Sequence, residues 1–509
     1  MLSKVKSASF HGIDGYIVTV EVDINPGLPF FSTVGLPDRA ITESKDRVSS
    51  AIKNSGYEYP TRRITVNLAP SDIKKEGVGF DLPIAIGILS ASGLIKQEKL
   101  EKYIIVGQLA LDGTLRSVRG ILPISQAIPE NIEGIIVPQE NAIEAAIAGK
   151  VKVYGVRNLR ETVDFLNDNI KIIPTEIQKE KFFSEKVEYD VDFSEVKGQE
   201  FAKRAIEVAA AGAHNVLMIG PPGTGKSMLA KRIPSILPLL SFEEAIETTK
   251  IHSVAGLLPN GKGLLSLRPF RTPHHTISDV ALIGGGSYPK PGEVSLAHNG
   301  VLFLDELPEF HRDVLEALRQ PLTDGTVTVS RAQTSLTFPA NFMLVAAMNP
   351  CPCGFYGHPE KECVCNLFQI QKYFGKISGP LLDRIDIHLE VPSLKVSEII
   401  DESSFSESSE EIRKRIIKAR EIQRQRFKKY KIHTNSKMNS KLIKKYCILN
   451  DDSKKLLSNA IEKFGLSARA YDNILKVART ISDLSEEENI TTQAIAEAIQ
   501  YRLLDRKFA

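Results

Sequence analysis

Short apolar runs alternate with helical patterns over the first third of the chain. Four runs rich in apolar and β-branched residues predict strands, at residues 16–22, 64–67, 103–106 and 134–137. Apolar positions at helical spacing predict helices over residues 38–54 and 82–92. Strands that alternate with helices predict an α/β or α+β domain, which we place over residues 1–170.

A second alternating pattern occupies the middle of the chain. Residues 171–192 are charged and lack periodicity, which predicts a linker. A helical run at 199–211 then leads into an apolar strand at 216–219 and a Gly-rich turn, and further apolar strands are predicted at 301–304 and 342–348. This order predicts a parallel sheet flanked by helices over residues 193–400.

The last hundred residues have a different pattern. Residues 401–411 are acidic and Ser-rich, which predicts a linker or surface loop, and the chain beyond them has helical periodicity. We therefore expect a third, helical region over residues 401–509.

Composition adds little to this picture. The chain of 509 residues is 42% hydrophobic and 25% charged, as is usual for globular proteins, and its net charge of +3 is too small to identify a nucleic-acid partner. No window reaches the ~18 consecutive apolar residues of a membrane span. We expect a soluble, cytoplasmic protein with no membrane partner.

The Gly-rich turn matches the phosphate-binding loop pattern. It lies between a predicted strand and a predicted helix and consists of Gly220, Pro221, Pro222, Gly223, Thr224, Gly225, Lys226 and Ser227. Glycines allow backbone N–H groups to surround phosphates at a helix N-terminus, which indicates ATP binding. Lys226 is expected to reach the β- and γ-phosphates, and the Ser227 hydroxyl to bind Mg²⁺.

Two further strand ends carry polar residues suited to the same chemistry. Asp305 and Glu306 follow the apolar strand 301–304, where Asp305 would bind Mg²⁺ and Glu306 would deprotonate the attacking water. Asn349 ends the next apolar strand and would polarise the same water or touch the γ-phosphate; alternatively it only forms a turn before Pro350.

Several long motifs resemble the magnesium chelatase-like AAA+ ATPase family, and most closely its ComM (YifB) branch. They are Arg268-Pro-Phe-Arg-Thr-Pro-His-His275, Gly284-Gly-Gly286, Gly300-Val-Leu-Phe-Leu-Asp-Glu-Leu-Pro-Glu-Phe310, Asn349-Pro-Cys-Pro-Cys-Gly354, Leu381-Leu-Asp-Arg-Ile-Asp386 and the stretch 470–484. The resemblance covers nearly the whole chain.

The resemblance implies a homo-hexameric AAA+ ring. In it, Asn349 is sensor 1, Arg384 is an arginine finger donated to the next subunit and Arg469 is sensor 2. Spacing alone would identify neither arginine, and Arg384 also suits a surface ion pair with Asp383 or Asp386. The branch is described as helicases that promote branch migration during natural transformation, which implies single-stranded or branched DNA as partner. The alternative is a chelatase-like ATPase that remodels a partner protein.

The resemblance also extends to the flanking regions. Residues 1–170 resemble a Lon-protease-like domain of the ribosomal S5 domain 2 type, but the turn 76–81 has no Ser and Leu122 stands where the companion Lys is expected. We therefore expect no peptidase activity, because a Ser and Lys dyad needs both groups. Residues 401–509 would form the helical lid.

Two basic features bear on DNA. Residues 325–338 are predicted to form a hairpin. In the more distant MCM relatives a hairpin before sensor 1 lines the pore, and this resemblance implies that Arg331 contacts DNA phosphates there; the alternative is an ordinary hairpin at a sheet edge. Residues 413–431 are densely basic with helical spacing, which suits either phosphate binding or a solvated helix face.

Four of the five cysteines fall within fifteen residues, as Cys351, Cys353, Cys363 and Cys365. Four soft ligands in one loop suit a structural, tetrahedral Zn²⁺. The alternative is four reduced thiols, because the C-x-C spacing is tighter than usual in zinc sites.

Overall fold

The computed structural model describes the chain except for residues 73, 74, 76, 78, 178–188, 260, 262, 287, 332, 333, 394–405 and 505–509, and the side chains at 331 and 334. Internal contacts divide the chain into two units. Unit 1 comprises Met1–Glu185 with Ser241–Ser266, and unit 2 comprises Lys186–Leu240 with Leu267–Ala509. The segment 241–266, which lies between two parts of unit 2 in the sequence, therefore folds with unit 1.

Unit 1 begins with a four-stranded sheet in the order β1-β2-β4-β3. Its strands are β1 (Leu2–His11), β2 (Asp14–Asn25), β3 (Phe30–Val34) and β4 (Arg63–Ala69). Buried and more exposed residues alternate along β2 and β4, because one face of the sheet packs on the core and the other does not. Helix α3 (Asp81–Ala91) covers β1 and β2.

The helix expected over residues 38–54 is divided in the structure. α1 (Arg39–Thr42) and α2 (Ser44–Asn54) are separated at Glu43. Asp38 caps α1 by accepting a hydrogen bond from the Ile41 N–H, which satisfies a backbone donor that has no partner within the helix.

A three-stranded parallel sheet completes unit 1, in the order β5-β8-β9. The remaining elements are α4 (Gln97–Leu100), β5 (Tyr103–Ile105), β6 (Gln108–Leu109), β7 (Leu115–Arg116), α5 (Ile121–Gln126), β8 (Gly134–Pro138), α6 (Ala142–Ile147), β9 (Lys152–Val156), α7 (Leu159–Leu166) and α11 (Phe242–Ala255). Helix α11 packs on α5. The Ser253 hydroxyl donates to the buried Glu144 carboxylate at 2.5 Å, and Glu144 also accepts from the Leu122 N–H at 2.9 Å.

The core of unit 2 is a five-stranded parallel sheet in the order β11-β14-β17-β10-β18. Its strands are β10 (Val216–Ile219), β11 (Phe270–Arg271), β14 (Val301–Leu304), β17 (Met343–Met348) and β18 (Ile387–Glu390). Every residue of β10, β14 and β17 is buried. Strands covered on both faces need continuous apolar runs, which is why these segments lack the alternation seen in β2.

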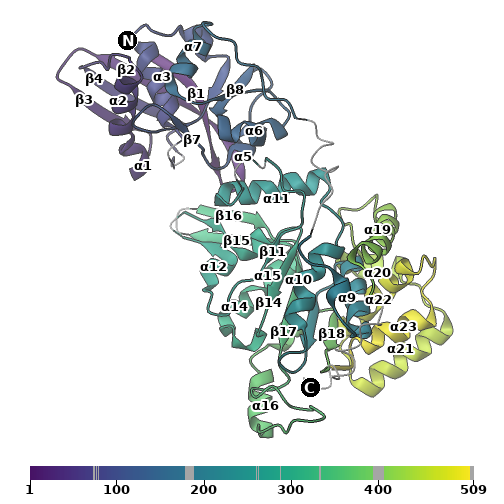
Figure 1. Ribbon diagram of the computed structural model, residues 1–509. Helices are drawn as coiled ribbons and strands as arrows, with labels where there is room; N and C mark the ends of the chain where they lie inside the picture. Colours follow the sequence, from purple (N-terminus) through teal and green to yellow (C-terminus); the bar gives the residue numbers. More distant parts are fainter. Residues whose placement is uncertain are drawn as a thin grey trace. The chain divides into compact units, whose positions relative to one another are not determined.

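Helices flank this sheet, and Figure 1 shows α9 (Glu200–Gly212) and α10 (Lys226–Ile236) running beside it. The other elements before the lid are α12 (Asp279–Ile283), β12 (Gly284–Gly285), β13 (Lys290–Pro291), α13 (Glu293–Leu296), α14 (Arg312–Ala317), α15 (Arg319–Asp324), β15 (Thr326–Arg331), β16 (Thr334–Pro339), α16 (Leu367–Phe374) and α17 (Gly379–Leu382). Short 3₁₀ turns occur at Phe193–Glu195 and Leu307–Glu309.

The C-terminal part of unit 2 is helical and continuous with the core around the sheet. It contains α19 (Ser409–Arg426), α20 (Ser440–Tyr446), α21 (Asp451–Phe464), α22 (Ala468–Leu484) and α23 (Thr492–Gln500). α19 and α22 both pack on α9. Asp483, which is fully buried, accepts hydrogen bonds from Arg426, Arg479 and Asn435. This group of charges fixes α22 to α19.

The expected α/β class, with parallel sheets and a helical C-terminal region, is confirmed. Among the described helices, none is long and apolar enough to span a bilayer.

Candidate nucleotide site

The carboxyl ends of three neighbouring strands gather the polar residues of the site. β17 lies between β14 and β10, with Ile219 paired to Met348 and Leu304 paired to Ala346. Because all three strands are parallel, the residues that follow them emerge at the same edge of the sheet. The P-loop, Asp305 and Asn349 therefore meet there, although they are far apart in the sequence.

The P-loop has the backbone that its glycines permit. Gly223 and Gly225 adopt φ of 79° and 83°, in the left-handed region that favours glycine. Helix α10 begins at Lys226, so its free N–H groups face the loop. The Lys226 ammonium donates to the Gly220 and Pro221 carbonyls at 2.6 and 2.7 Å. Burial lowers the pKa of Lys226, while the Asp305 carboxylate opposes that shift.

The residues predicted to bind Mg²⁺ are in direct contact. The Ser227 hydroxyl donates to the Asp305 carboxylate at 2.6 Å. A hydroxyl and a carboxylate supply the hard oxygen ligands that Mg²⁺ prefers, so this pair fits the ion. Asn349 joins the group from β17, because its side-chain oxygen lies 3.4 Å from the Lys226 ammonium.

Glu306 has an unusual backbone conformation. Its φ of 53° is left-handed, which costs a non-glycine residue on the order of 1–3 kcal/mol and occurs most often at functional sites. The Glu306 N–H donates to the Asp305 carboxylate at 3.0 Å. This turn directs the two consecutive acids into different positions, which fits the separate Mg²⁺ and water roles predicted for them.

The structure adds two residues that the sequence analysis did not assign to the site. His275 Nδ1 lies 3.5 Å from the Glu306 carboxylate, and the Gln199 amide donates to the Thr224 carbonyl at 2.6 Å. Gln199 also has a left-handed φ of 55°. No sequence motif predicts either contact. The only local features at these positions are the repeated His and the Gly198-Gln199 pair before a helix.

Arg384 and Arg469 both lie near Asp383, close enough for their charges to interact. Arg384 donates to the Thr323 hydroxyl at 2.8 Å and to the Pro380 carbonyl at 2.5 Å. Arg469 lies 4.0 Å from the Asp383 carboxylate. Burial lowers the pKa of Arg384, and the charge of Arg469 adds to this. Within the part of the chain that the structure describes, no hydrogen bond or ion pair joins either arginine to Lys226, Ser227, Asp305 or Glu306.

The four predicted zinc ligands converge. The sulfur atoms of Cys351, Cys353, Cys363 and Cys365 all lie within 4.8 Å of one another. His358, which lies between them in the sequence, is bound elsewhere, since its Nδ1 accepts from the Glu360 and Lys361 N–H groups at 3.1 Å.

The two basic features differ in outcome. β15 and β16 form the expected hairpin, with Val327 paired to Phe338, but the side chain of Arg331 lies outside the described residues. The basic stretch forms α19 up to Arg426, and several of its cations have partners within the chain. Arg415 pairs with Glu207 and Glu407, and Arg420 donates to the Ala210 carbonyl. These residues hold α19 on α9, so they are neither a free phosphate-binding stripe nor simply a solvated face.

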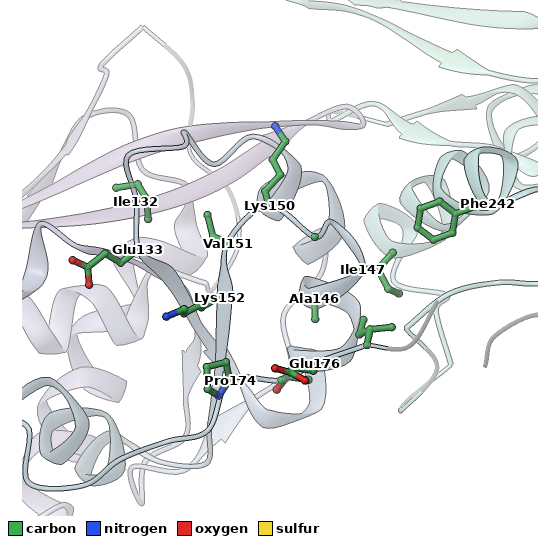
Figure 2. A pocket seen from close by; sticks show the side chains of 13 residues that line it. Ile132, Glu133, Ala146, Ile147, Lys150, Val151, Lys152, Pro174, Glu176 and Phe242 are labelled. Atoms are coloured by element: carbon green, nitrogen blue, oxygen red, sulfur yellow. The ribbon is translucent and has the colours of Figure 1, made fainter. Parts of the chain in front are cut away.

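Unit 1 contains a hollow of about 580 Å³ between β9, α6 and α11 (Figure 2). Its lining includes none of the residues predicted for the nucleotide or metal sites. Two of its charged groups are already bound, since Lys150 donates to the Gln126 carbonyl and Glu133 pairs with Lys102. Its mixed, open lining does not indicate a particular ligand.

Family models match three stretches of the chain. The model for magnesium chelatase subunit ChlI matches residues 192–399, a second ChlI model matches 20–141, and the model for the ChlI C-terminal region matches 406–502. Together with the P-loop and the paired acids, these matches define the class of protein. The chain belongs to the magnesium chelatase family of AAA+ ATPases.

Full-length relatives place the chain more narrowly. It is 46% identical to competence protein ComM of Haemophilus influenzae over 99% of this chain and 98% of that protein. It is 43% identical to the uncharacterised protein YifB of Escherichia coli, over the same shares of the two chains. The magnesium-chelatase 38 kDa subunit of Rhodobacter capsulatus is more distant, with 27% identity over 40% of this chain and 56% of that subunit. The predicted resemblance to the ComM (YifB) branch is thereby confirmed.

Proposed function

We propose that the protein is an ATP-hydrolysing ring motor that acts on DNA, as a branch-migration helicase in recombination during natural transformation. The cofactors are ATP and Mg²⁺. Lys226 binds the β- and γ-phosphates, Ser227 and Asp305 hold Mg²⁺, Glu306 deprotonates the attacking water and Asn349 orients it.

One observation carries the ATPase part of the proposal. The Ser227 hydroxyl and the Asp305 carboxylate are 2.6 Å apart at the end of the P-loop, with the Asn349 amide 3.4 Å from the Lys226 ammonium. Asp305 and Asn349 follow the ends of β14 and β17, and Lys226 and Ser227 begin α10. Their meeting supplies phosphate binding, metal binding and a water-activating acid at one place.

The arginines support a ring. Arg384 and Arg469 both lie near Asp383 and share no contact with the phosphate-binding residues among the described parts of the chain. A cation that stabilises the transition state must touch the γ-phosphate. We therefore infer that Arg384 serves the nucleotide of a neighbouring subunit in a homo-hexamer, and we propose Arg469 as sensor 2, which reaches the phosphate from the helical lid.

The proposal that DNA is the partner is supported by the name of one relative and by the β15–β16 hairpin. The relative in Haemophilus influenzae is named a competence protein, and β15–β16 precedes Asn349 as expected for a hairpin that lines the pore. In this proposal, residues 1–170 are a non-catalytic Lon-protease-like domain joined by the linker 171–192 to the ATPase core at 193–400, and 401–509 form the lid. The protein is cytoplasmic, and a structural Zn²⁺ binds Cys351, Cys353, Cys363 and Cys365.

The test compares ATP hydrolysis by the full chain, Glu306→Gln and Glu309→Gln. Glu309 is a suitable control, because it lies three residues further on and its carboxylate pairs with Lys376. Each protein is assayed without DNA, with single-stranded DNA and with branched DNA at low salt, and branch migration is followed on labelled junctions.

We expect branched DNA to stimulate hydrolysis in the wild type and Glu309→Gln but not in Glu306→Gln. A rate that DNA leaves unchanged, but that a protein fraction of the host raises, would replace this proposal by the partner-remodelling ATPase. No hydrolysis under any condition would refute the ATPase itself.

A further inference from the structure

The loop between β17 and α16 holds its four cysteines in one cluster. Cys351 and Cys353 lie 3.3 Å apart at sulfur, and Cys363 lies 3.6 and 3.5 Å from them. A disulfide requires about 2.05 Å, so these sulfurs are not bonded pairs. Four ligands at about 2.3 Å around a tetrahedral zinc ion have neighbouring sulfurs about 3.8 Å apart, which is close to the observed spacing.

The same loop lacks an apolar core that would fix its shape. Cys351 is fully buried, but Val364 is 84% exposed and Tyr356 is 43% exposed. Most of the residues between Cys351 and Asn366 are at least partly exposed. Short segments without a core usually need a metal ion or a disulfide for a defined conformation. A metal ion is the choice that fits the sulfur distances.

Backbone hydrogen bonds turn the loop so that the sulfurs face one another. The Gly354 N–H donates to the Cys351 carbonyl at 3.0 Å, and the Tyr356 N–H donates to the Cys351 sulfur at 3.3 Å. His358 is held by other partners, so the ligand set consists of cysteines alone.

Both ends of the loop are attached to the nucleotide site. At the first end, Cys351 is two residues from Asn349, and Gly354 packs so closely on Pro222 of the P-loop that a Cβ there would lie 2.7 Å from the proline ring. At the second end, Asn366 caps α16, and Tyr373 of α16 has a hydrogen bond with the backbone of Asn349. The cysteines therefore close a ring that begins and ends at Asn349.

We propose that a single Zn²⁺ bound by Cys351, Cys353, Cys363 and Cys365 locks this ring and thereby fixes Asn349 against the P-loop. Zinc binds as the thiols release their protons to solvent, and no redox change is involved. The site itself depends only on the cysteines, whereas its role in positioning Asn349 rests on the proposed ATPase function.

The first experiment measures metal in the purified full chain by mass spectrometry, for the wild type, Cys365→Ser and Cys447→Ser. Cys447 is the matched control, because it is a buried cysteine outside the cluster. We expect one zinc per chain in the wild type and Cys447→Ser, and loss of it in Cys365→Ser. Exchange of the wild type with Co²⁺ should give the absorption of a tetrahedral tetrathiolate site, which needs no variant to fold.

Three results would overturn the site. They are a wild type that holds no zinc after growth with added zinc and binds no Co²⁺, a pair of disulfides found by thiol counting, and bound iron in place of zinc.

The second experiment tests the clamp by hydrogen exchange and nucleotide binding. In Cys365→Ser we expect faster amide exchange over residues 349–374 and a several-fold higher KM for ATP, with α9 and β10 unchanged. Zinc loss that alters neither exchange nor KM would overturn the clamp and leave the zinc site in place. Zinc bound to a chain that hydrolyses no ATP would refute the proposed ATPase and leave the zinc site in place.

Discussion

The division of the site between subunits can be tested by mixing two inactive variants. Glu306→Gln removes the water-activating acid and leaves Lys226 and Arg384 in place, so it should bind ATP without hydrolysing it. Arg384→Ala removes the finger and leaves the P-loop and both acids intact. Each alone should lose turnover roughly 10³-fold or more, because loss of an arginine finger or of the water-activating group has effects of that order.

The expected rate of the mixture follows from the geometry. In the proposed ring, an active site needs Glu306 from the subunit that holds ATP and Arg384 from its neighbour; among the described residues, Arg384 has no contact with the phosphate-binding residues of its own chain. In a ring filled at random from equal amounts, about one quarter of the interfaces meet both conditions. We therefore expect about a quarter of the wild-type ATPase rate, if the sites act independently.

The assay is steady-state ATP hydrolysis. The rings of both variants are first dissociated into subunits by dilution, and the subunits are then mixed and allowed to reassemble. Arg384→Ala should remain folded, because it loses two hydrogen bonds of about 1 kcal/mol each at a partly exposed position. Arg424→Ala, at an exposed arginine of α19, is the control and should stay fully active. The trans role of Arg384 would be refuted if the ATP hydrolysis rate of the mixture equals the sum of the rates of the two variants alone, although the rings are seen to exchange subunits.

Three further outcomes are expected. Asp483→Asn should lower the free energy of unfolding by about 3–5 kcal/mol in urea titrations, because it leaves two buried guanidinium groups without a counter-charge. Lys226→Met should abolish the rise in melting temperature that Mg²⁺–ATP gives the wild type, without lowering the melting temperature of the ATP-free protein, because burial already disfavours the charged lysine. Burial raises the pKa of Glu144. The contribution of Glu144 to stability should therefore be present below its unfolded-state pKa and be lost as the pH rises through its folded-state pKa. Glu144→Gln should flatten this pH dependence, measured as the urea midpoint of unit 1.

The two substitutions of buried acids have controls in the chain. Asp451→Asn and Glu140→Gln change exposed acids and should leave stability almost unchanged. An Asp483→Asn variant as stable as its control would contradict the role given to the buried ion group. A Lys226→Met variant that ATP still stabilises would contradict the predicted phosphate contact. A Glu144→Gln variant whose urea midpoint depends on pH as in the wild type would show that other carboxyl groups cause that dependence.

The sequence by itself determined the local chemistry. The P-loop could be read directly, because glycines at 223 and 225 permit the left-handed backbone and Lys226 starts a helix. The apolar run before Asp305 predicted a strand buried on both faces, and β14 is fully buried. These features depend on neighbouring residues only, so a linear pattern is sufficient to identify them.

Only the tertiary structure decided which distant groups meet. Strand order places β17 between β14 and β10, and this order, which no local pattern encodes, brings Asn349 to Lys226 and Asp305 to Ser227. Tertiary packing likewise brings His275 into contact with Glu306 and places the segment 241–266 in unit 1.

The basic helix α19 and the cysteine loop illustrate the same limit. Arg415 and Arg420 looked free in the sequence but are bound to groups on α9 or close to α19. The cysteine spacing allowed either reduced thiols or a metal site, and the convergence of the four sulfurs depends on how the loop turns. Sequence patterns report the preferences of a segment, whereas its partners are set by burial and pairing across the whole fold, because each group gains or loses stability according to what surrounds it.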